Sequence, residues 1–381
     1  MTVPASPPLI EVITGRPRPR HLRFAAELTE LVPGAFLERR DLNLLQRVRT
    51  NAACRLTGVR VVSISNCGVP VMLHQALAST DIPHAVEFDV PLAIHGYRYG
   101  AYLRHADKAR RLLENPALRV LFVFSEWAKR SFATHFGEEV GAKCRVSYPL
   151  AASQARFGSE TRRYDFTFIS TNFRIKGGPE LLRAFAAVRQ SGAWEAQLCV
   201  VTNLVEAKNL LGDLAAFPGV EWREANLDQA AIAHLLSESH CLVHPSLWES
   251  FGVVVLEALA AGCAVIATDI ASLPEVVADG SGRVLVTPIG QVVGDISIPE
   301  FGNPRAFARL LNRLSLHRLE DALAGAMSEL VADPVLMAHH QRAARAVYTA
   351  RFSREVWRER MREDLRAAFP EFETLPLATE A

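Results

Sequence analysis

Short runs of apolar and β-branched residues alternate with helical patterns along this chain, which is typical of parallel α/β architecture. In the first half, the pattern predicts helices at 21–32 and 126–137 and strands at 9–15, 34–40, 59–65, 84–90, 119–125 and 144–149. Around Leu150–Tyr164 the pattern lapses into the polar segment LAASQARFGSETRRY. This lapse indicates a linker between two domains.

The second half of the chain shows the same alternation of strand and helix patterns. It predicts strands at 165–170, 197–202, 220–225, 241–246, 264–269 and 282–288. Pro179 suits the first turn of the helix after the first of these strands, and Gly262 suits a left-handed helix cap. After Pro304 the chain reads as helical to its end. We therefore predict two doubly wound domains, residues 1–152 and 153–345, followed by a C-terminal helix at 346–381. A cleft between the domains is the expected ligand site.

Composition narrows the class of protein. The chain has 381 residues, of which 49% are hydrophobic and 22% charged, with a formal net charge of +1, so no overall field attracts nucleic acid. The six cysteines form no CxxC pair, and the N-terminal MTVPASPPLIEV has neither a charged region nor a long apolar core. These features predict a reduced, cytoplasmic protein without a signal peptide. The most apolar stretch, Val253–Ala267, is too short to span a membrane.

The segment HPSLWESFGVVVLEALAAGCAVIATD, residues 244–269, carries the most informative chemistry. Glu249 lies in the loop after an apolar strand, and Glu257 lies eight residues later in the following helix. The free amides at a helix start, together with its dipole, form an anion site. Glu257 lies about two turns into the helix, where a carboxylate is better placed for neutral hydroxyls such as a ribose diol. The predicted donor-binding residues are Ser250, Phe251, Gly252, Val253 and Glu257.

This segment resembles the E-x7-E signature of glycosyltransferase family 4, also called glycosyl transferases group 1, whose pattern is roughly P-S-x-x-E-x-F-G-x-x-x-x-E-A. The fixed positions match at Pro245, Ser246, Glu249, Phe251, Gly252, Glu257 and Ala258. The following ASLPEVVADGSGRVL resembles the family's next run, with Ala271 and Ser272 in place of two glycines.

A second match lies at FISTNFRIKGGPELLRAF, residues 168–185, where the family has a basic pair before K-G. The pair here is Arg174 and Lys176. A leaving nucleoside diphosphate develops negative charge, and cations aimed at such charge give roughly 2–4 kcal/mol of transition-state stabilisation. Arg174 suits bidentate phosphate contact and Lys176 acts as a point charge.

The resemblance implies a GT-B fold, with two Rossmann-like domains and a final helix crossing back to the first. It also implies a retaining hexosyltransferase that uses a UDP- or GDP-linked sugar and no cofactor. Glu249, Lys176 and Arg174 are the expected catalytic residues, and Glu257 is expected to hold the ribose. No D-x-D motif occurs in the chain, which favours a metal-independent enzyme.

The N-terminal half departs from the family pattern. Where members carry a glycine-rich phosphate loop, this chain has TGRPRPRH. Where members carry a histidine that contacts the donor sugar, this chain offers Asp89, with His95 further along, as sugar or acceptor contacts. The acceptor therefore stays open between a glycan, a lipid-linked molecule and a small molecule.

Residues 1–60 hold ten arginines against five acidic residues. Solvated helix faces explain most such excesses. Arg16, Arg18 and Arg20 alternate with prolines, so they can instead contact an anionic membrane at the inner face or grip the donor diphosphate.

Three other classes of protein share parts of this pattern. A phosphorylase with pyridoxal phosphate has a much longer chain, and a nicotinamide dehydrogenase needs a G-x-G-x-x-G that is absent here. The alternative that the sequence leaves open is a non-catalytic sugar-nucleotide-binding partner of an active homologue.

Overall fold

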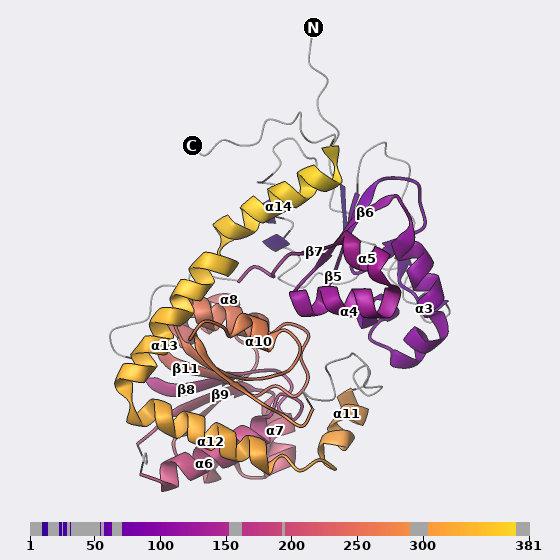
Figure 1. Cartoon of the computed structure of the whole chain (residues 1–381). Helices are drawn as coiled ribbons and strands as arrows, with labels where there is room; N and C mark the ends of the chain where they lie inside the picture. Colours follow the sequence, from indigo (N-terminus) through magenta and orange to yellow (C-terminus); the bar gives the residue numbers. More distant parts are fainter. Residues whose placement is uncertain are drawn as a thin grey trace. The chain divides into compact units, whose positions relative to one another are not determined.

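The computed structural model describes residues 10–13, 71–151, 162–192, 195–289 and 304–370, with shorter stretches between 23 and 31 and between 54 and 62 (Figure 1). The chain divides into two compact units: Met1–Leu150 with Arg354–Ala381, and Ala151–Ser353. The expected strand at 34–40, the Arg-Pro loop at 15–20, most of the expected linker and the segment 290–303 lie outside the described residues.

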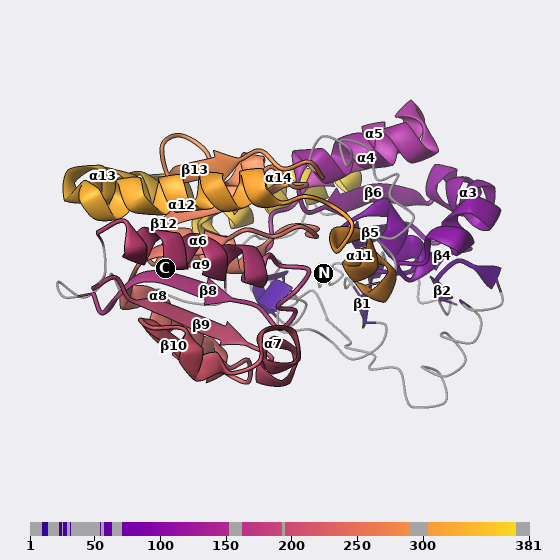
Figure 2. The same ribbon diagram turned by 90° about the horizontal axis from the view of Figure 1, so that it is seen from below.

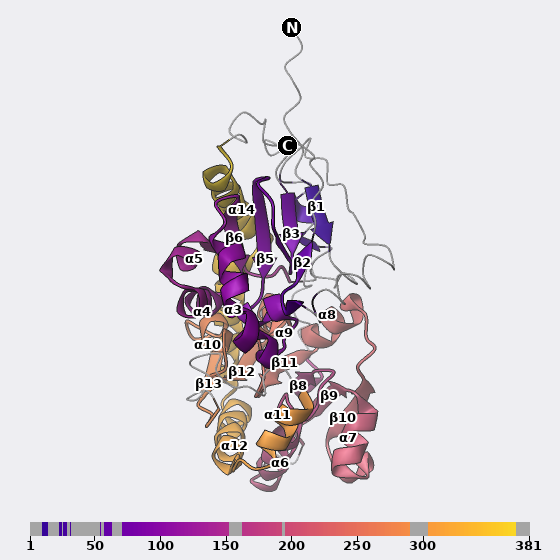
Figure 3. The same cartoon turned by 90° about the vertical axis from the view of Figure 1, so that its right-hand side faces the viewer.

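The first unit is built on a parallel sheet in the order β1-β3-β5-β6-β7. Strands β6, β5, β3 and β1 follow one another in this order in Figure 3. The strands are β1 (Ile10–Ile13), β3 (Val71–His74), β5 (His84–Phe88), β6 (Leu118–Val123) and β7 (Cys144–Val146), and a separate parallel pair joins β2 (Val61–Val62) to β4 (Leu77–Ala78). The helical elements are η1 (Pro91–His95), α3 (Tyr99–Glu114), α4 (Glu126–Phe136) and α5 (Glu138–Lys143).

The sequence pattern missed strand β3. Its four residues, VMLH, are all buried and show no alternation of polar and apolar positions. Three apolar residues followed by a histidine are too short a run to be told from a buried helical segment by periodicity.

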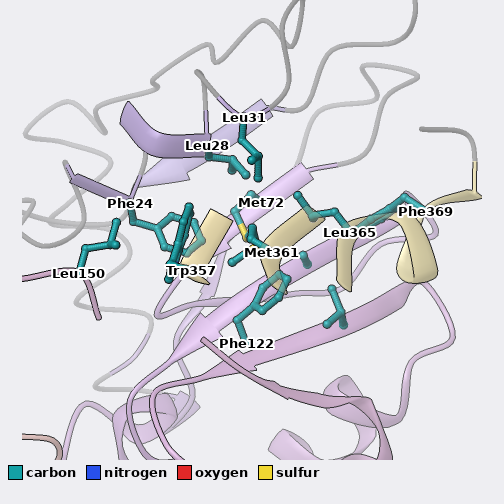
Figure 4. Packing of buried hydrophobic residues seen from close by; sticks show 12 residues of the cluster. Phe24, Leu28, Leu31, Met72, Phe122, Leu150, Trp357, Met361, Leu365 and Phe369 are labelled. Carbon is teal, nitrogen blue, oxygen red and sulfur yellow. The ribbon is translucent and has the colours of Figure 1, made fainter. Parts of the chain in front are cut away.

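The C-terminal helix α14 (Arg354–Ala368) belongs to the first unit, as the fold class predicts. Trp357, Met361 and Leu365 are spaced by four residues, which places them on one face of the helix. They are buried, together with Phe369, in a cluster with residues of the sheet and with described helical residues between 23 and 31 (Figure 4). The other members of this cluster are Phe24, Leu28, Leu31, Met72, Ala85, Val120, Phe122 and Leu150.

The second unit contains a six-stranded parallel sheet in the order β10-β9-β8-β11-β12-β13. Figure 2 shows β10, β9 and β8 side by side in this order. All six strands predicted for this half are present: β8 (Tyr164–Ile169), β9 (Leu198–Thr202), β10 (Val220–Glu224), β11 (Ser239–His244), β12 (Ala264–Thr268) and β13 (Gly282–Leu285).

Helices flank this sheet, and α6 and α12 lie side by side (Figures 1 and 3). The helices are α6 (Gly178–Gln190), α7 (Leu204–Leu211), α8 (Gln229–Ser237), α9 (Val253–Ala260), α10 (Leu273–Val276), α11 (Pro304–Leu311), α12 (His317–Ala332) and α13 (Pro334–Val347), with a short 3-10 helix η2 (Leu214–Ala216) and a π-helix η4 (Tyr348–Phe352). Pro179 lies in the first turn of α6, and Gly262 has φ +69°, the left-handed conformation predicted for it. No helix in the described part of the chain is long and apolar enough to cross a membrane.

Candidate functional site

The strand order of the second sheet reverses between β8 and β11. The chain moves outward from β8 to β9 and β10, and then returns to place β11 on the other side of β8. Ligands of open parallel sheets bind beyond the carboxyl ends of the strands at such a reversal. The two loops that follow β8 and β11 are residues 170–177 and 245–252, and they carry both motifs identified in the sequence.

These two loops are joined backbone to backbone. The Leu247 amide donates to the Ile175 carbonyl at 3.1 Å. Gly177 has φ +76°, and a Cβ atom at this position would lie 2.1 Å from the Pro245 carbonyl oxygen. Only glycine satisfies both conditions, since it tolerates a positive φ and has no Cβ. The glycine of the K-G pair therefore sets the distance between the loops.

The contact between the loops brings Lys176 to Glu249. Lys176 Nζ lies 2.7 Å from Glu249 Oε2, and it also donates to the Trp248 carbonyl. The two side chains are largely buried, with 15% and 13% of their surfaces exposed. The sequence predicted each residue separately and did not predict that they form an ion pair.

Glu249 has three further hydrogen-bond donors, one side chain and two backbone amides. His244 Nε2 lies 3.0 Å from Glu249 Oε2, and the Ser250 and Phe251 amides donate to Oε1 at 3.0 and 3.3 Å. Burial by itself raises the pKa of this carboxyl, but the Lys176 charge and the hydrogen bonds from His244 and Lys176 outweigh it. The pKa of Glu249 is therefore held well below its usual range, and the side chain is ionised.

Arg174 is placed differently from Lys176. Its NH1 donates to both carboxylate oxygens of Glu180, at 3.0 and 3.2 Å, and its Nε donates to Asn312 Oδ1 at 3.2 Å. Glu180 is fully buried in α6 and is also bonded by Arg183. The positive charge that the sequence assigned to the diphosphate is thus neutralised by a carboxylate in this structure.

The predicted donor-binding turn starts helix α9. Phe251 is buried, Gly252 has φ +86°, and Val253 is the first helical residue. The first amides of a helix have no partner within it, so this end of α9 offers donors to an anion. Glu257 lies within the same helix and is 7% exposed.

Residues at the end of β12 and in the loop after it bond to the backbone of the segment that carries this turn. Ser272 Oγ donates to the Phe251 carbonyl at 2.9 Å, and Thr268 Oγ1 donates to the Ser246 carbonyl. Ala271 has φ +52°, a left-handed conformation in a non-glycine residue. The structure thus explains why the family pattern has glycine where this chain has Ala271.

In the first unit, Asp89 and His95 differ in their surroundings. Asp89 follows β5, and its Oδ2 accepts a hydrogen bond from the Tyr97 hydroxyl at 2.6 Å. His95 is fully buried, with its Nδ1 2.7 Å from the Gly58 carbonyl, and burial lowers its pKa to about 4. A neutral histidine within the core fits a structural role better than the substrate contact suggested for His95.

Two residues of the site were not singled out in the sequence. Glu180 lies six residues after Arg174 in the first turn of a helix, and this spacing was an available signal. His244 is the last residue of an apolar strand, and no local pattern marks it as a partner of Glu249. Its side chain is 2% exposed.

Within the described residues, no group of three or more His, Cys, Asp or Glu side chains is arranged to hold a metal ion. The cysteines at 54, 144, 199, 241 and 263 are buried and form no disulfide. Metal independence stays a prediction.

The chain is similar to known proteins in sequence and in fold. Residues 163–315 match the family model described as glycosyl transferases group 1. Alpha-maltose-1-phosphate synthase from Mycolicibacterium smegmatis is 44% identical over 140 residues, which are 35% of this chain and 35% of that protein. D-inositol 3-phosphate glycosyltransferase from Arthrobacter is 29% identical over 191 residues, 48% of this chain and 45% of that protein. The chain thus matches less than half the length of these curated relatives.

Solved structures extend the likeness over nearly the whole chain. HepE from Anabaena, in complex with UDP and glucose, gives a TM-score of 0.61 at 14% identity and covers 94% of this chain and 99% of its own. Two parallel α/β units with a C-terminal helix packed on the first define the GT-B fold. The residues that match the glycosyl transferases group 1 model all lie within the second unit.

Proposed function

We propose that this chain is a retaining, metal-independent glycosyltransferase that moves a sugar from a nucleoside-diphosphate sugar to a hydroxyl acceptor. The observation that carries the proposal is the pairing of Lys176 with Glu249 at the point where the strand order reverses. A cation and a carboxylate placed together in this way match the two ends of a sugar diphosphate, one anionic and the other rich in hydroxyl groups.

The donor is best accounted for as a UDP- or GDP-linked sugar. HepE, which shares the fold, is described in complex with UDP and glucose. In the proposed complex, the first amides of α9 and Lys176 bind the diphosphate, and Glu257 accepts hydrogen bonds from the ribose hydroxyls. Glu249 accepts hydrogen bonds from the donor sugar and stabilises positive charge at its anomeric carbon.

Binding requires one change in the contacts of Glu249. A carboxylate accepts about four hydrogen bonds, and Glu249 already receives them from Lys176, His244 and two backbone amides. The amides are fixed by the backbone and His244 is buried, whereas Lys176 has a flexible stem. We infer that Lys176 turns from Glu249 to the diphosphate, which frees Oε2 for a sugar hydroxyl.

The chemical step follows from this placement. The bond between the anomeric carbon and the diphosphate oxygen breaks, and the acceptor oxygen bonds to the same face of that carbon. The acceptor proton passes to the departing diphosphate oxygen. Lys176 stabilises the charge that grows on the diphosphate, and Arg174 braces the loop through Glu180.

The acceptor is proposed only as a class. The candidates are a glycan, a lipid-linked molecule and a small molecule, and we propose Asp89, which follows β5 and accepts a hydrogen bond from the Tyr97 hydroxyl, as a contact for the acceptor. Arg16, Arg18 and Arg20 support contact with an anionic membrane surface. Sedimentation with anionic and neutral vesicles tests this contact: salt-sensitive binding to anionic vesicles alone, lost on Arg→Ser changes at these three positions, is the expected result.

A panel of UDP- and GDP-sugars tests the proposed function. At ~100 times the dissociation constant, a ligand stabilises the chain by about 2.7 kcal/mol, which thermal shift detects. Each sugar nucleotide that binds is then assayed for hydrolysis and transfer, with anomer analysis of the product. Binding without either reaction would favour the non-catalytic alternative, and an inverted anomer or a requirement for Mg²⁺ or Mn²⁺ would contradict the proposed mechanism.

A further inference from the structure

His244 is the last residue of β11, and the loop that carries Glu249 follows it in the chain. Its ring is 2% exposed, and its Nε2 lies 3.0 Å from Glu249 Oε2. The backbone of His244 is fixed within strand β11, which pairs with β8 on one side and with β12 on the other. Of the four donors to Glu249, this is the side chain whose position the central sheet fixes.

The proton of His244 has one favourable location. Glu249 is ionised, so its oxygens act only as acceptors, and Nε2 must carry the proton to form the hydrogen bond. Nδ1 is buried and has no hydrogen-bond partner among the described residues. A proton on Nδ1 would leave a buried donor unsatisfied and turn the Nε2 lone pair toward the carboxylate, and both effects are unfavourable. Burial also lowers the pKa of His244, which keeps the ring neutral.

We propose that His244 is a positioning residue, which holds the Glu249 carboxylate in the orientation that receives the donor sugar. The inference rests on the proposed function. When Lys176 turns to the diphosphate, His244 and the two amides are the donors that remain. The histidine then prevents the carboxylate from following the lysine, so Glu249 stays directed at the sugar.

The ring itself does not act on substrate. Its Nε2 is occupied by Glu249 and its Nδ1 is buried, so neither nitrogen is open to a proton of the acceptor. Removing His244 should therefore affect interactions with the sugar and leave those with the nucleotide.

Two amide substitutions separate the hydrogen bond from the bulk of the ring. The side-chain nitrogen of Gln is as many bonds from Cα as Nε2 of His, whereas that of Asn matches Nδ1. His244→Gln thus keeps a donor for Glu249, and His244→Asn places it away from Glu249. His244→Leu removes the donor and keeps an apolar side chain of similar size.

The first experiment compares these variants by binding and kinetics, with UDP, GDP, UDP-glucose and GDP-mannose as probes. We expect His244→Leu and His244→Asn to lower kcat/KM by about tenfold to a hundredfold, the effect of losing a hydrogen bond to a charged group. Affinity for UDP or GDP alone should be unchanged, and His244→Gln should restore most of the turnover. Equal loss of affinity for the nucleotide and the sugar nucleotide, or no rescue by Gln, would overturn the positioning role.

The second experiment does not depend on the donor. A double-mutant cycle of His244→Leu and Glu249→Gln, measured by urea unfolding, should show coupling between the two residues. His340→Leu is the matched control, because His340 is also buried in the second unit but is bonded to the Gly280 carbonyl. The control should be destabilised without coupling to Glu249. Additive effects of His244→Leu and Glu249→Gln would contradict the inference, whereas coupling in a chain that binds none of the four probes would reject the proposed function.

Discussion

Gly177 and Pro245 approach so closely that no side chain fits between them: a Cβ on Gly177 would lie 2.1 Å from the Pro245 carbonyl oxygen. The two residues belong to loops that follow neighbouring strands, β8 and β11. Since Lys176 precedes Gly177 and Glu249 follows Pro245 by four residues, this approach determines whether the ion pair can form.

Gly177→Ala should therefore be far more destabilising than an ordinary glycine substitution. The matched control is Gly212→Ala, because Gly212 has a similar φ of +81° but open space around it. The free energy of unfolding of the control should fall by roughly 1–2 kcal/mol, which is the cost of a left-handed alanine. That of Gly177→Ala should fall further, because the two loops must separate. Urea unfolding measures both, and equal losses would show that the close approach does not matter.

Lys176→Ala should lower turnover more than it raises the donor KM. Charge on the diphosphate grows as the bond breaks, so a cation that meets it contributes mainly in the transition state. We expect kcat to fall by about a hundredfold. Lys208→Ala, at an exposed position of α7, is the control and should be kinetically silent. An unchanged kcat with a raised KM would place Lys176 in ground-state binding alone.

Glu257→Ala should weaken binding of the nucleoside diphosphate as well as of the sugar nucleotide, because the proposed contact is with the ribose. Two hydrogen bonds to a carboxylate account for roughly 1.5–3 kcal/mol each. Calorimetry with UDP and GDP measures the loss, and circular dichroism checks the fold. Glu329→Ala, an exposed carboxylate paired with Arg283, serves as control. Unchanged nucleotide affinity would remove Glu257 from the site.

Acid should selectively reduce the stability that Glu249 contributes. Its pKa is depressed in the folded chain, whereas in the unfolded chain it is near 4.3, an approximate reference value. Between the folded and the unfolded pKa, Glu249 is protonated in the unfolded chain and ionised in the folded chain. Its contribution to the free energy of unfolding is therefore complete above the unfolded pKa and decreases as pH falls below it. The stability difference between the native chain and Glu249→Gln should therefore shrink below about pH 4.3. Urea unfolding across pH 3 to 7 tests this prediction. A stability difference that does not change with pH would mean that these contacts do not lower the pKa of Glu249.

Ala271→Gly should stabilise the chain, which is unusual for a glycine substitution. Ala271 adopts φ +52°, where glycine is favoured by roughly 1–2 kcal/mol. The greater freedom of glycine in the unfolded chain offsets part of this, so a net gain of about 0.5 kcal/mol is expected. Thermal unfolding measures it. Ala187→Gly, at an exposed position within α6, should instead destabilise by about 1 kcal/mol.

Local pattern was sufficient for much of this protein. The six strands of the second sheet, the first turn of α6 at Pro179 and the left-handed Gly262 were predicted correctly, because apolar periodicity and the backbone preferences of proline and glycine act over a few residues. The short strand β3 was missed, because its four residues, all of them buried, show no periodicity.

What the sequence determined by itself was therefore the α/β class, the six strands of the second sheet and the loops that carry Lys176 and Glu249. Only the tertiary structure decided how those residues are used. It paired Lys176 with Glu249, neutralised Arg174 with Glu180, buried His95 in a core and placed His244 behind Glu249. The physical reason is that charge pairing and burial depend on which strands become neighbours. Lys176 and Glu249 are 73 residues apart, so they become partners only when the sheet forms.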